Sequence, residues 1–389
     1  MRNLVWLKAI SLGALVAAVG CGGGETESKN TNTPTTTTSA QAPTPSASAQ
    51  ATTVQAPPKA PLADLIKKTM AEFDAGVAAH DAAKCAAAYA ADAQYTQPGP
   101  MGWHASTKDE VQKNLDILFK AFPDLKIVAT RTFMKGNEMA VEGVMAGTNT
   151  GEFMAHPATN KKIGHRFIAI LSFNDDGLIK TEHLYHDHAT MMAHLGHGDA
   201  KLKARNVEAI PTTTIEQISE TDNAREAKNA DAAKAWFATW EKKDDKAYVA
   251  SLADDVTKAN YMNPADVKGK EAAKKAFDEM HKTFPDMKLT PTSVLALGDW
   301  VVAEVEMTGT MKGDLGSTKS TGKPGTAHLA EVLKFNKDGK IAWASRYGSR
   351  AELATAFGIP PKAAAAAINA TGATGAAHGH GPAKDEKKK

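Results

Sequence analysis

One short stretch of the chain gathers side chains that can accept or donate protons. His183, Tyr185 and Asp187 alternate along a run rich in strand-forming residues. Because side chains two residues apart on a strand point to the same face, we expect these three to point the same way. His165 begins the preceding strand-like run and is expected to lie across from them. The spacing therefore predicts a polar cluster on one sheet face.

Histidines are concentrated in the first half of the chain, where nine of the thirteen lie between His80 and His197. Neutral imidazoles bind zinc or copper, so His183, His186 and His188 raise the possibility of a metal site. No two-Cys or His-Glu-Xaa-Xaa-His spacing accompanies them, and His183 should face away from His186. Surface histidines near a strand end are the favoured interpretation. No metal and no cofactor are predicted.

The amino terminus is typical of an exported protein. A basic start and a short apolar run end in Ala18-Val19-Gly20-Cys21, which resembles the lipobox of bacterial lipoproteins. Residues 1–21 are therefore predicted to be a lipoprotein signal peptide, with Cys21 as the acylated first residue of the mature chain. Gly22 is not Asp, and the resemblance to lipoproteins sorted in enteric bacteria then implies the outer membrane of the cell envelope. Cys85 is then the sole remaining thiol and is expected to be a small buried hydrophobe.

Composition separates the rest of the chain into segments. The 389 residues carry a net charge of +2, without a basic stripe, so no nucleic-acid partner is predicted. Segments poor in large apolar residues cannot offset the entropy of ordering and are expected to be a stalk, a linker and a tail. They are residues 22–61, 198–223 and 360–389.

An internal repeat fills the remaining residues. Phe122-Pro123-Asp124 recurs as Phe284-Pro285-Asp286, and Gly147-Thr148 recurs as Gly309-Thr310, each after 162 residues. A constant offset over more than a hundred residues indicates a duplicated domain. We therefore place domain 1 at residues 62–197 and domain 2 at residues 224–359.

Each copy places helices before strands. Apolar residues from Leu62 to Val77 recur at helical spacing, and the pattern returns over Thr107 to Phe119. Strand-forming runs follow, with the turn signal Asn174-Asp175-Asp176-Gly177 between two of them. The order predicts an α+β class with an antiparallel sheet in each copy. Four runs of copy one are expected to be strands: residues 126–134, 138–148, 165–174 and 178–187.

These motifs, in this order, resemble the SnoaL-like polyketide cyclase and ester cyclase family of the nuclear transport factor 2-like superfamily. The resemblance rests on Phe122-Pro123-Asp124, Gly147-Thr148 with Gly151, Asp176-Gly177, Asp187 and Leu195-Gly196. It implies two tandem cones, each a curved antiparallel sheet wrapped by helices around a pocket. Such a fold hosts enzymes, ligand-binding modules and assembly partners.

The resemblance also implies roles for individual residues. The family's acid or base on the last strand corresponds to Asp187, with His183 or Tyr185 donating a hydrogen bond to an enolate oxygen. Asn149 replaces a histidine common in the family, and domain 2 has Ser345 and Ser349 in place of His183 and Asp187. In a second interpretation, Asp187 caps either the end of the strand or the following helix, Ala189 to Leu195.

Other residues are candidates for lining a pocket. They are Trp103, His104, Asn149, His165 and Tyr347. Trp103 could close the mouth of the pocket, although packing against the sheet is the favoured interpretation. Trp236 and Trp240, one helical turn apart, are expected in the core.

The sequence is compatible with two functions. The first is an envelope lipoprotein whose domains bind a small apolar or amphipathic molecule, or a protein partner, without catalysis. The alternative is a cyclase or isomerase that uses Asp187 of domain 1 as general acid or base. The departures in domain 2 favour binding. Relatives often pair through the outer sheet face, and the two copies could pair in that way within one chain or between chains.

Overall fold

The computed structural model describes residues 60–99, 102–198, 203–221, 223–315 and 318–360. The predicted signal peptide with Cys21, residues 22–59 of the predicted stalk and residues 361–389 of the predicted tail lie outside these residues. Among the described residues, no helix is long and apolar enough to cross a membrane.

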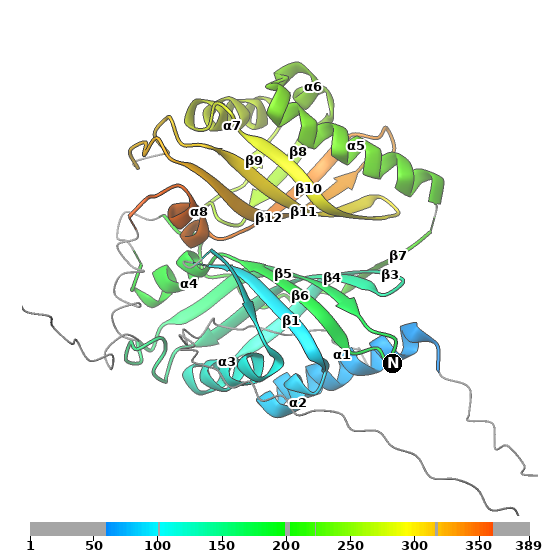
Figure 1. Cartoon of the computed structure of the whole chain (residues 1–389), viewed down its shortest axis with the longest axis vertical. Coiled ribbons are helices and arrows are strands. Elements are labelled where there is room, and N and C mark those ends of the chain that lie inside the picture. Colours follow the sequence, from blue (N-terminus) through cyan, green and yellow to red (C-terminus); the bar gives the residue numbers. More distant parts are fainter. Residues whose placement is uncertain (1–59, 100–101, 199–202, 222, 316–317, 361–389) are drawn as a thin grey trace, which may run out of the picture. The chain divides into compact units, whose positions relative to one another are not determined.

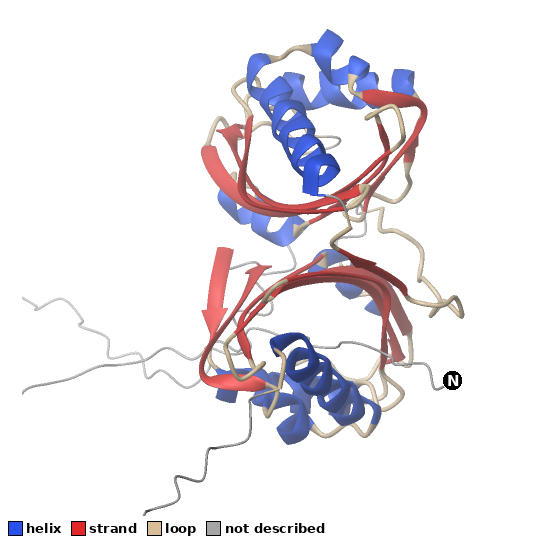
Figure 2. Cartoon of the chain, turned by 90° about the vertical axis from the view of Figure 1, so that its right-hand side faces the viewer, coloured by secondary structure: helices blue, strands red, loops and turns tan. Residues whose placement is uncertain are grey.

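In each domain the helices that precede the sheet pack on one face of it, and the last helix lies on the side of the other domain (Figures 1 and 2). This arrangement confirms the α+β class. Domain 1 comprises α1 (Leu62–Ala78), α2 (Ala82–Ala86), β1 (Tyr89–Gly99), β2 (Gly102–Ser106), α3 (Lys108–Ala121), β3 (Lys126–Lys135), β4 (Glu138–Thr148), β5 (Lys162–Phe173), β6 (Ile179–His186) and α4 (His188–Leu195). Domain 2 comprises α5 (Asn223–Lys242), α6 (Asp245–Ala250), β8 (Leu252–Asn260), β9 (Val267–Lys268), α7 (Lys270–Thr283), β10 (Lys288–Leu297), β11 (Trp300–Thr310), β12 (Pro324–Phe335), β13 (Ile341–Tyr347) and α8 (Arg350–Ala356).

The two sheets share one topology. Their strand orders are β2-β1-β6-β5-β4-β3-β7, in which β7 is Glu216–Ser219, and β10-β11-β12-β13-β8-β9. The four consecutive strands β3 to β6, and β10 to β13, are antiparallel neighbours, whereas β1 and β8 join β6 and β13 in parallel. The predicted meander is therefore confirmed in both copies.

The segment between the domains contains a strand that the polar sequence did not indicate. Residues Glu216–Ser219 form β7, which pairs in parallel with β3. The Arg131 Nε donates a hydrogen bond to the Glu216 carboxylate at 2.8 Å. Domain 1 thus extends its sheet with part of the predicted linker.

The amphipathic pattern of the first helix is confirmed by burial. Ile66, Met70, Phe73 and Val77 of α1 are all at most 1% exposed and face the sheet. Helix α3 begins at a capping box, in which Thr107 and Glu110 satisfy each other's backbone groups, and it ends at Ala121, ahead of the proline at position 123.

The repeated motifs join a loop to a strand. The Asp124 carboxylate accepts hydrogen bonds from the Thr148 backbone N–H at 2.6 Å and hydroxyl at 2.8 Å. Asp286 and Thr310 repeat this pair at 2.7 Å for both bonds. Phe-Pro-Asp and Gly-Thr recur because each copy needs this link.

Replacing Asp124 or Asp286 by Ala should cost about 1 kcal/mol of stability at pH 7 in either domain, because both carboxylates are largely exposed. Burial opposes ionisation of Asp124, but the hydrogen bonds from Thr148 outweigh it and hold its pKa below 3.8. The Thr310 bonds lower the pKa of Asp286 likewise. The stabilisation is therefore present above pH 4 and lost as the pH falls through these lowered values. Urea unfolding at pH 7 and pH 2 tests this, and an undiminished effect at pH 2 would contradict it.

The outer faces of the two sheets contact each other (Figure 2). Arg131 of β3 lies with its guanidinium carbon 4.0 Å from the centre of the Trp300 ring of β11. The apolar side chains of this contact come from both domains: Phe133, Ala140, Ile168, Tyr185, Leu297, Trp300, Val302, Ala330, Val332 and Tyr347. Within the described part of the chain, the copies therefore share a third apolar cluster beside their own cores.

Candidate functional site

Strand β6 divides its polar side chains between two faces. His183 and Tyr185 point to the outer face, toward domain 2, while Glu182 and His186 point inward. The expectation that His183 and Tyr185 share a face is met. Asp187 lies one residue beyond the strand, and its contacts differ from theirs.

Both outward residues bind one carboxylate of domain 2. The Glu304 carboxylate on β11 lies 2.6 Å from the His183 Nδ1 and accepts hydrogen bonds from the Tyr185 hydroxyl at 2.8 Å and the Ser293 hydroxyl at 3.0 Å. Burial disfavours the charge of Glu304, yet the contacts with His183, Tyr185 and Ser293 prevail and lower its pKa. These groups therefore hold Glu304 as an anion between the domains.

The same arrangement recurs in the opposite direction. The Glu142 carboxylate on β4 accepts hydrogen bonds from the Tyr347 hydroxyl at 2.6 Å and the Ser345 hydroxyl at 2.9 Å. Arg131 also pairs with Glu142. Glu142 and Glu304, like Tyr185 and Tyr347, are 162 residues apart. Equivalent residues thus make reciprocal contacts, as in a two-fold interface.

Removing the two phenol hydroxyls should weaken this interface equally from both sides. We expect Tyr185→Phe and Tyr347→Phe each to cost about 1 to 3 kcal/mol, because each hydroxyl donates to a buried carboxylate. Equilibrium unfolding in urea measures the loss. Tyr95→Phe removes a hydroxyl that bonds Gln97 at 3.0 Å within domain 1 and is the control. A cost at Tyr185 no larger than at Tyr95 would contradict the expectation.

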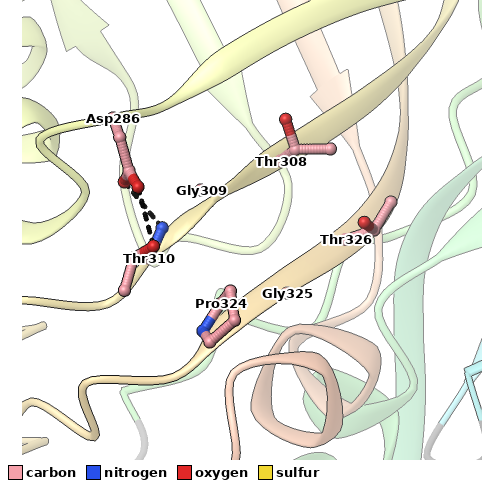
Figure 3. Close-up of a pocket in the computed structure, with 7 residues that line it drawn as sticks. All are labelled: Asp286, Thr308, Gly309, Thr310, Pro324, Gly325 and Thr326. Atoms are coloured by element: carbon pink, nitrogen blue, oxygen red, sulfur yellow. Dashed lines mark hydrogen bonds between the residues drawn. The ribbon is translucent and has the colours of Figure 1, made fainter.

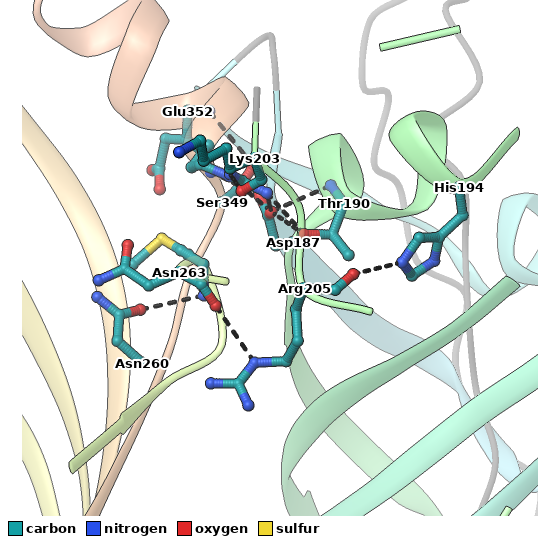
Figure 4. Close-up of polar contacts among 11 residues, drawn as sticks. Asp187, Thr190, His194, Lys203, Arg205, Asn260, Asn263, Ser349 and Glu352 are labelled. Atoms are coloured by element: carbon teal, nitrogen blue, oxygen red, sulfur yellow. Dashed lines mark hydrogen bonds and ion pairs between the residues drawn. The ribbon is translucent and has the colours of Figure 1, made fainter. Parts of the chain in front are cut away.

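Asp187 is engaged by its own helix and by domain 2 (Figure 4). It caps α4, and its carboxylate accepts hydrogen bonds from the Thr190 N–H at 3.1 Å and hydroxyl at 2.7 Å. Arg350, at the start of α8, donates its backbone N–H at 2.9 Å and its Nε at 2.8 Å to the same carboxylate. The side chain of Asp187 is 2% exposed. The capping interpretation is therefore confirmed, with an interdomain ion pair added to it.

The remaining predicted pocket residues are dispersed. Asn149 accepts from the Thr159 N–H at 2.8 Å and donates to the Gly151 carbonyl at 2.8 Å, so it organises the loop after β4. Trp103 and His104 lie in β2, paired with β1, rather than next to β6. Tyr347 is buried at the interface described above. Of the predicted site residues, His183 and Tyr185 are the two that the structure brings together, and both contact the Glu304 carboxylate.

His165 lies on the inner sheet face, not across from His183 as expected. Its ring stacks on that of His186 at 5.3 Å, and both its nitrogens are buried without a hydrogen-bond partner. Burial lowers the pKa of His165 well below 6.5, that of His186 to about 3, and that of His188 below 6.5. These rings are neutral at pH 7. No group of three or more described His, Cys, Asp or Glu residues is arranged to hold a metal ion.

A buried carboxyl that sequence reasoning missed lies inside domain 1. Glu182 is completely buried and accepts a short hydrogen bond from the Tyr89 hydroxyl. Burial raises the pKa of Glu182 to about 8, so the carboxyl is mostly protonated at pH 7. Its Oε1, and both amide atoms of Asn114 on α3, have no hydrogen-bond partner. Buried polar groups of this kind mark candidate functional sites.

Two surface hollows lie elsewhere. One of about 430 Å³ lies between the ends of β11 and β12 (Figure 3), and it is lined by Asp286, Thr308, Gly309, Thr310, Pro324, Gly325 and Thr326. The other, of about 330 Å³, includes Arg166, Arg205, Tyr261 and Trp343. In this second hollow each arginine is already paired with a carboxylate, Glu208 and Asp266 respectively.

Comparison with known families assigns the two copies. The SnoaL-like polyketide cyclase family matches residues 67–195, and the SnoaL-like domain family matches residues 233–344. The chain carries two SnoaL-like domains in tandem. Each SnoaL-like domain has the nuclear transport factor 2-like fold that the sequence resemblance implies. Among curated proteins, none matches this sequence significantly.

Solved structures resemble one SnoaL-like domain at a time. AclR from Streptomyces galilaeus is 24% identical, with 35% of this chain and 99% of AclR covered and a TM-score of 0.32. A ketosteroid isomerase-like protein from Catenulispora acidiphila, solved with trimethylamine, is 22% identical, with 33% and 93% covered and a TM-score of 0.30. TsrD from Streptomyces laurentii is 20% identical, with 36% and 100% covered and a TM-score of 0.32.

Proposed function

We propose that this chain is a lipid-anchored protein of the bacterial cell envelope that binds a small molecule in its first SnoaL-like domain, without catalysis through Asp187. The observation that carries the proposal is the pairing of Asp187 with Arg350 of domain 2. A general base needs an oxygen free to reach substrate. Both oxygens of Asp187 already accept hydrogen bonds, from Thr190 and Arg350.

The proposed donors are engaged as well. His183 and Tyr185 contact Glu304 on the outer sheet face, whereas a ligand inside the cone would touch the inner face. A residue that points away from the interior cannot donate a hydrogen bond to an enolate held there. The family's acid–base set is thus used in this chain to join its two domains.

Ligand binding is supported by the interior of domain 1. Phe73 packs edge-to-face on Tyr89, whose hydroxyl donates to Glu182. Glu182 and Asn114 are both buried in domain 1 and carry polar atoms without protein partners. Small-molecule sites commonly combine an apolar lining with a few such polar groups. The ligand class that fits is a small, mostly apolar molecule carrying a hydrogen-bond acceptor for the protonated Glu182.

Co-purification tests this proposal. We expect native mass spectrometry of the chain extracted from its host envelope to show a small organic molecule on the wild type and on Asp187→Asn. Glu182→Ala, which removes the polar anchor, should lose it, whereas Glu152→Ala, at an exposed glutamate, should keep it. A ligand absent from the wild type, or unaffected by Glu182→Ala, would contradict binding at this site.

The envelope location is tested separately. Residues Ala18 to Cys21 resemble a lipobox, so we expect Cys21→Ser to abolish incorporation of labelled palmitate and to release the chain from the membrane fraction. Cys85→Ser, which leaves Cys21 intact, is the control and should change neither palmitate incorporation nor membrane association. Palmitate labelling that survives in Cys21→Ser would refute the anchor.

A second candidate is proton transfer through Glu182, as in a cyclase or isomerase. The observation that favours it is the raised pKa of Glu182, about 8, beside the Tyr89 hydroxyl. An acid with such a pKa can protonate a substrate at neutral pH. Glu182→Gln decides between the candidates, because an enzyme would accumulate bound substrate in this variant, while a binding protein would carry the same molecule as the wild type.

A further inference from the structure

The interior of domain 2 carries a lysine surrounded by aromatic rings. The Lys258 amine on β8 donates a hydrogen bond to the Tyr248 hydroxyl at 2.5 Å. It lies 5.3 Å from the centre of the Trp236 ring, 5.5 Å from that of Trp240 and 5.0 Å from that of Tyr248. The Lys258 side chain is partly exposed, whereas Trp236, Trp240 and Tyr248 are at most 2% exposed.

A second cation faces the same interior but has its own counter-ion. Arg346 of β13 pairs with Glu331 of β12, and their side chains are 13% and 2% exposed. The Arg346 guanidinium carbon lies 5.7 Å from the centre of the Trp240 ring. Lys258, in contrast, forms no ion pair with any described carboxylate. The cluster therefore has two basic groups and one acidic group.

Two hydrogen-bond donors in this cluster are also unused. The indole N–H groups of Trp236 and Trp240 are buried and have no partner, although both rings contact Lys258. An unpaired buried donor costs about 1 to 3 kcal/mol, so such groups are uncommon unless a ligand or water completes them.

The fold does not require any of these residues. The repeat places Leu184 and Ala169 of domain 1 at the positions of Arg346 and Glu331, 162 residues apart. Tyr95 corresponds to Lys258 at an offset of 163, because Tyr95 pairs with Glu182 as Lys258 pairs with Ala344. Phe73, Val77 and Cys85 correspond at this same offset of 163 to Trp236, Trp240 and Tyr248, as the helix caps Asp81 and Asp244 do. Domain 1 packs this space with apolar side chains and one phenol. The basic and aromatic set is thus a property of domain 2 alone.

We propose that domain 2 binds a small organic carboxylate with an aromatic or other apolar body, using the Lys258 amine as the ion-pair partner of the carboxylate. The body of the ligand would pack on Trp236 and Trp240, whose indole N–H groups offer further donors. This site is separate from the one proposed in domain 1 and stands or falls independently of it.

The charge of the lysine gives binding a pH dependence. Burial and the Arg346 guanidinium lower the pKa of Lys258 to about 7. The other groups that face the cluster are Tyr248, Glu331 and His281, the last of which stacks on Trp240 at 5.7 Å. A bound carboxylate favours the ammonium form, so affinity should fall as the pH rises above 7, with proton uptake on binding.

Benzoate and its neutral analogue benzamide test the proposal by isothermal titration calorimetry on the full chain. We expect benzoate to bind and benzamide to bind at least about tenfold more weakly, since a charged hydrogen bond is lost. Lys258→Met should weaken benzoate binding by about 10- to 100-fold and remove its pH dependence. Lys337→Met, on an exposed turn, is the control.

A second variant keeps Lys258 and changes the neighbouring ion pair instead. Arg346→Leu with Glu331→Ala reproduces the pair in domain 1 and removes both charges together, so no buried charge is left alone. It should fold and still bind benzoate through Lys258. The proposal is overturned if millimolar benzoate does not bind the wild type, if benzamide binds equally well, or if a folded Lys258→Met chain binds benzoate unchanged.

Discussion

Replacing Glu182 by Gln should stabilise the chain at pH 8 and flatten its stability profile between pH 5 and pH 8. The carboxyl has a pKa of about 8 in the folded chain, against 4.5 when unfolded, because burial penalises its charge. Between these values the folded state holds a proton that the unfolded state has lost, so stability falls as the pH rises. At 1.36 kcal/mol per pKa unit, the difference reaches about 4 kcal/mol near pH 8, and Gln removes it.

Urea unfolding of the wild type and Glu182→Gln from pH 5 to pH 8 measures this effect. At pH 5 the two should be equally stable to within about 1 kcal/mol, since Gln is similar in shape to the protonated acid. Glu152→Gln, at an exposed position, should follow the wild type throughout. If Glu182→Gln remains parallel to the wild type, the carboxyl is not a buried acid.

Replacing Asp187 by Ala should lower the free energy of unfolding by about 3 kcal/mol. This loss should exceed that for Ser349, the cap at the equivalent position of domain 2. Loss of a helix cap costs about 1 kcal/mol, and breaking a largely buried ion pair costs more because the remaining charge is left unpaired. Asp187 provides both contacts, since it caps α4 and pairs with Arg350. Ser349, its equivalent in domain 2, only caps α8.

Ser349→Ala is therefore the matched control and should cost about 1 kcal/mol. Thermal and urea unfolding of both variants at pH 7 give the comparison. Equal losses would mean that Asp187 acts as a cap alone and that its contact with Arg350 adds nothing.

The fold could be predicted from the sequence because its signals are local or repeated. The apolar spacing from Leu62 to Val77 and the turn at Asn174 to Gly177 define elements within one copy. The constant offset between the copies then shows the same element pattern a second time. Strand β7 escaped prediction because Glu216–Ser219 is short and polar and becomes a strand only by pairing with β3.

The site was less predictable because strand alternation does not say which face is inside. His183 and Tyr185 were correctly placed on one face, but only the packing against domain 2 makes that face an interface. A signal for it was present in the repeat, where Glu142 and Glu304 are identical at the same offset as Tyr185 and Tyr347. No sequence signal marked Glu182 as a buried acid, since its neighbours in sequence are polar and its partner Tyr89 is distant along the chain.

Whether Asp187 joins the two domains is tested most directly by a double-mutant cycle with Arg350. Unfolding free energies of the wild type, Asp187→Asn, Arg350→Gln and the double variant give the coupling between the side chains. We predict a coupling of about 1 to 3 kcal/mol, with the double variant no less stable than Asp187→Asn alone. A coupling of zero within error would contradict the interdomain role and return Asp187 to the candidates for catalysis.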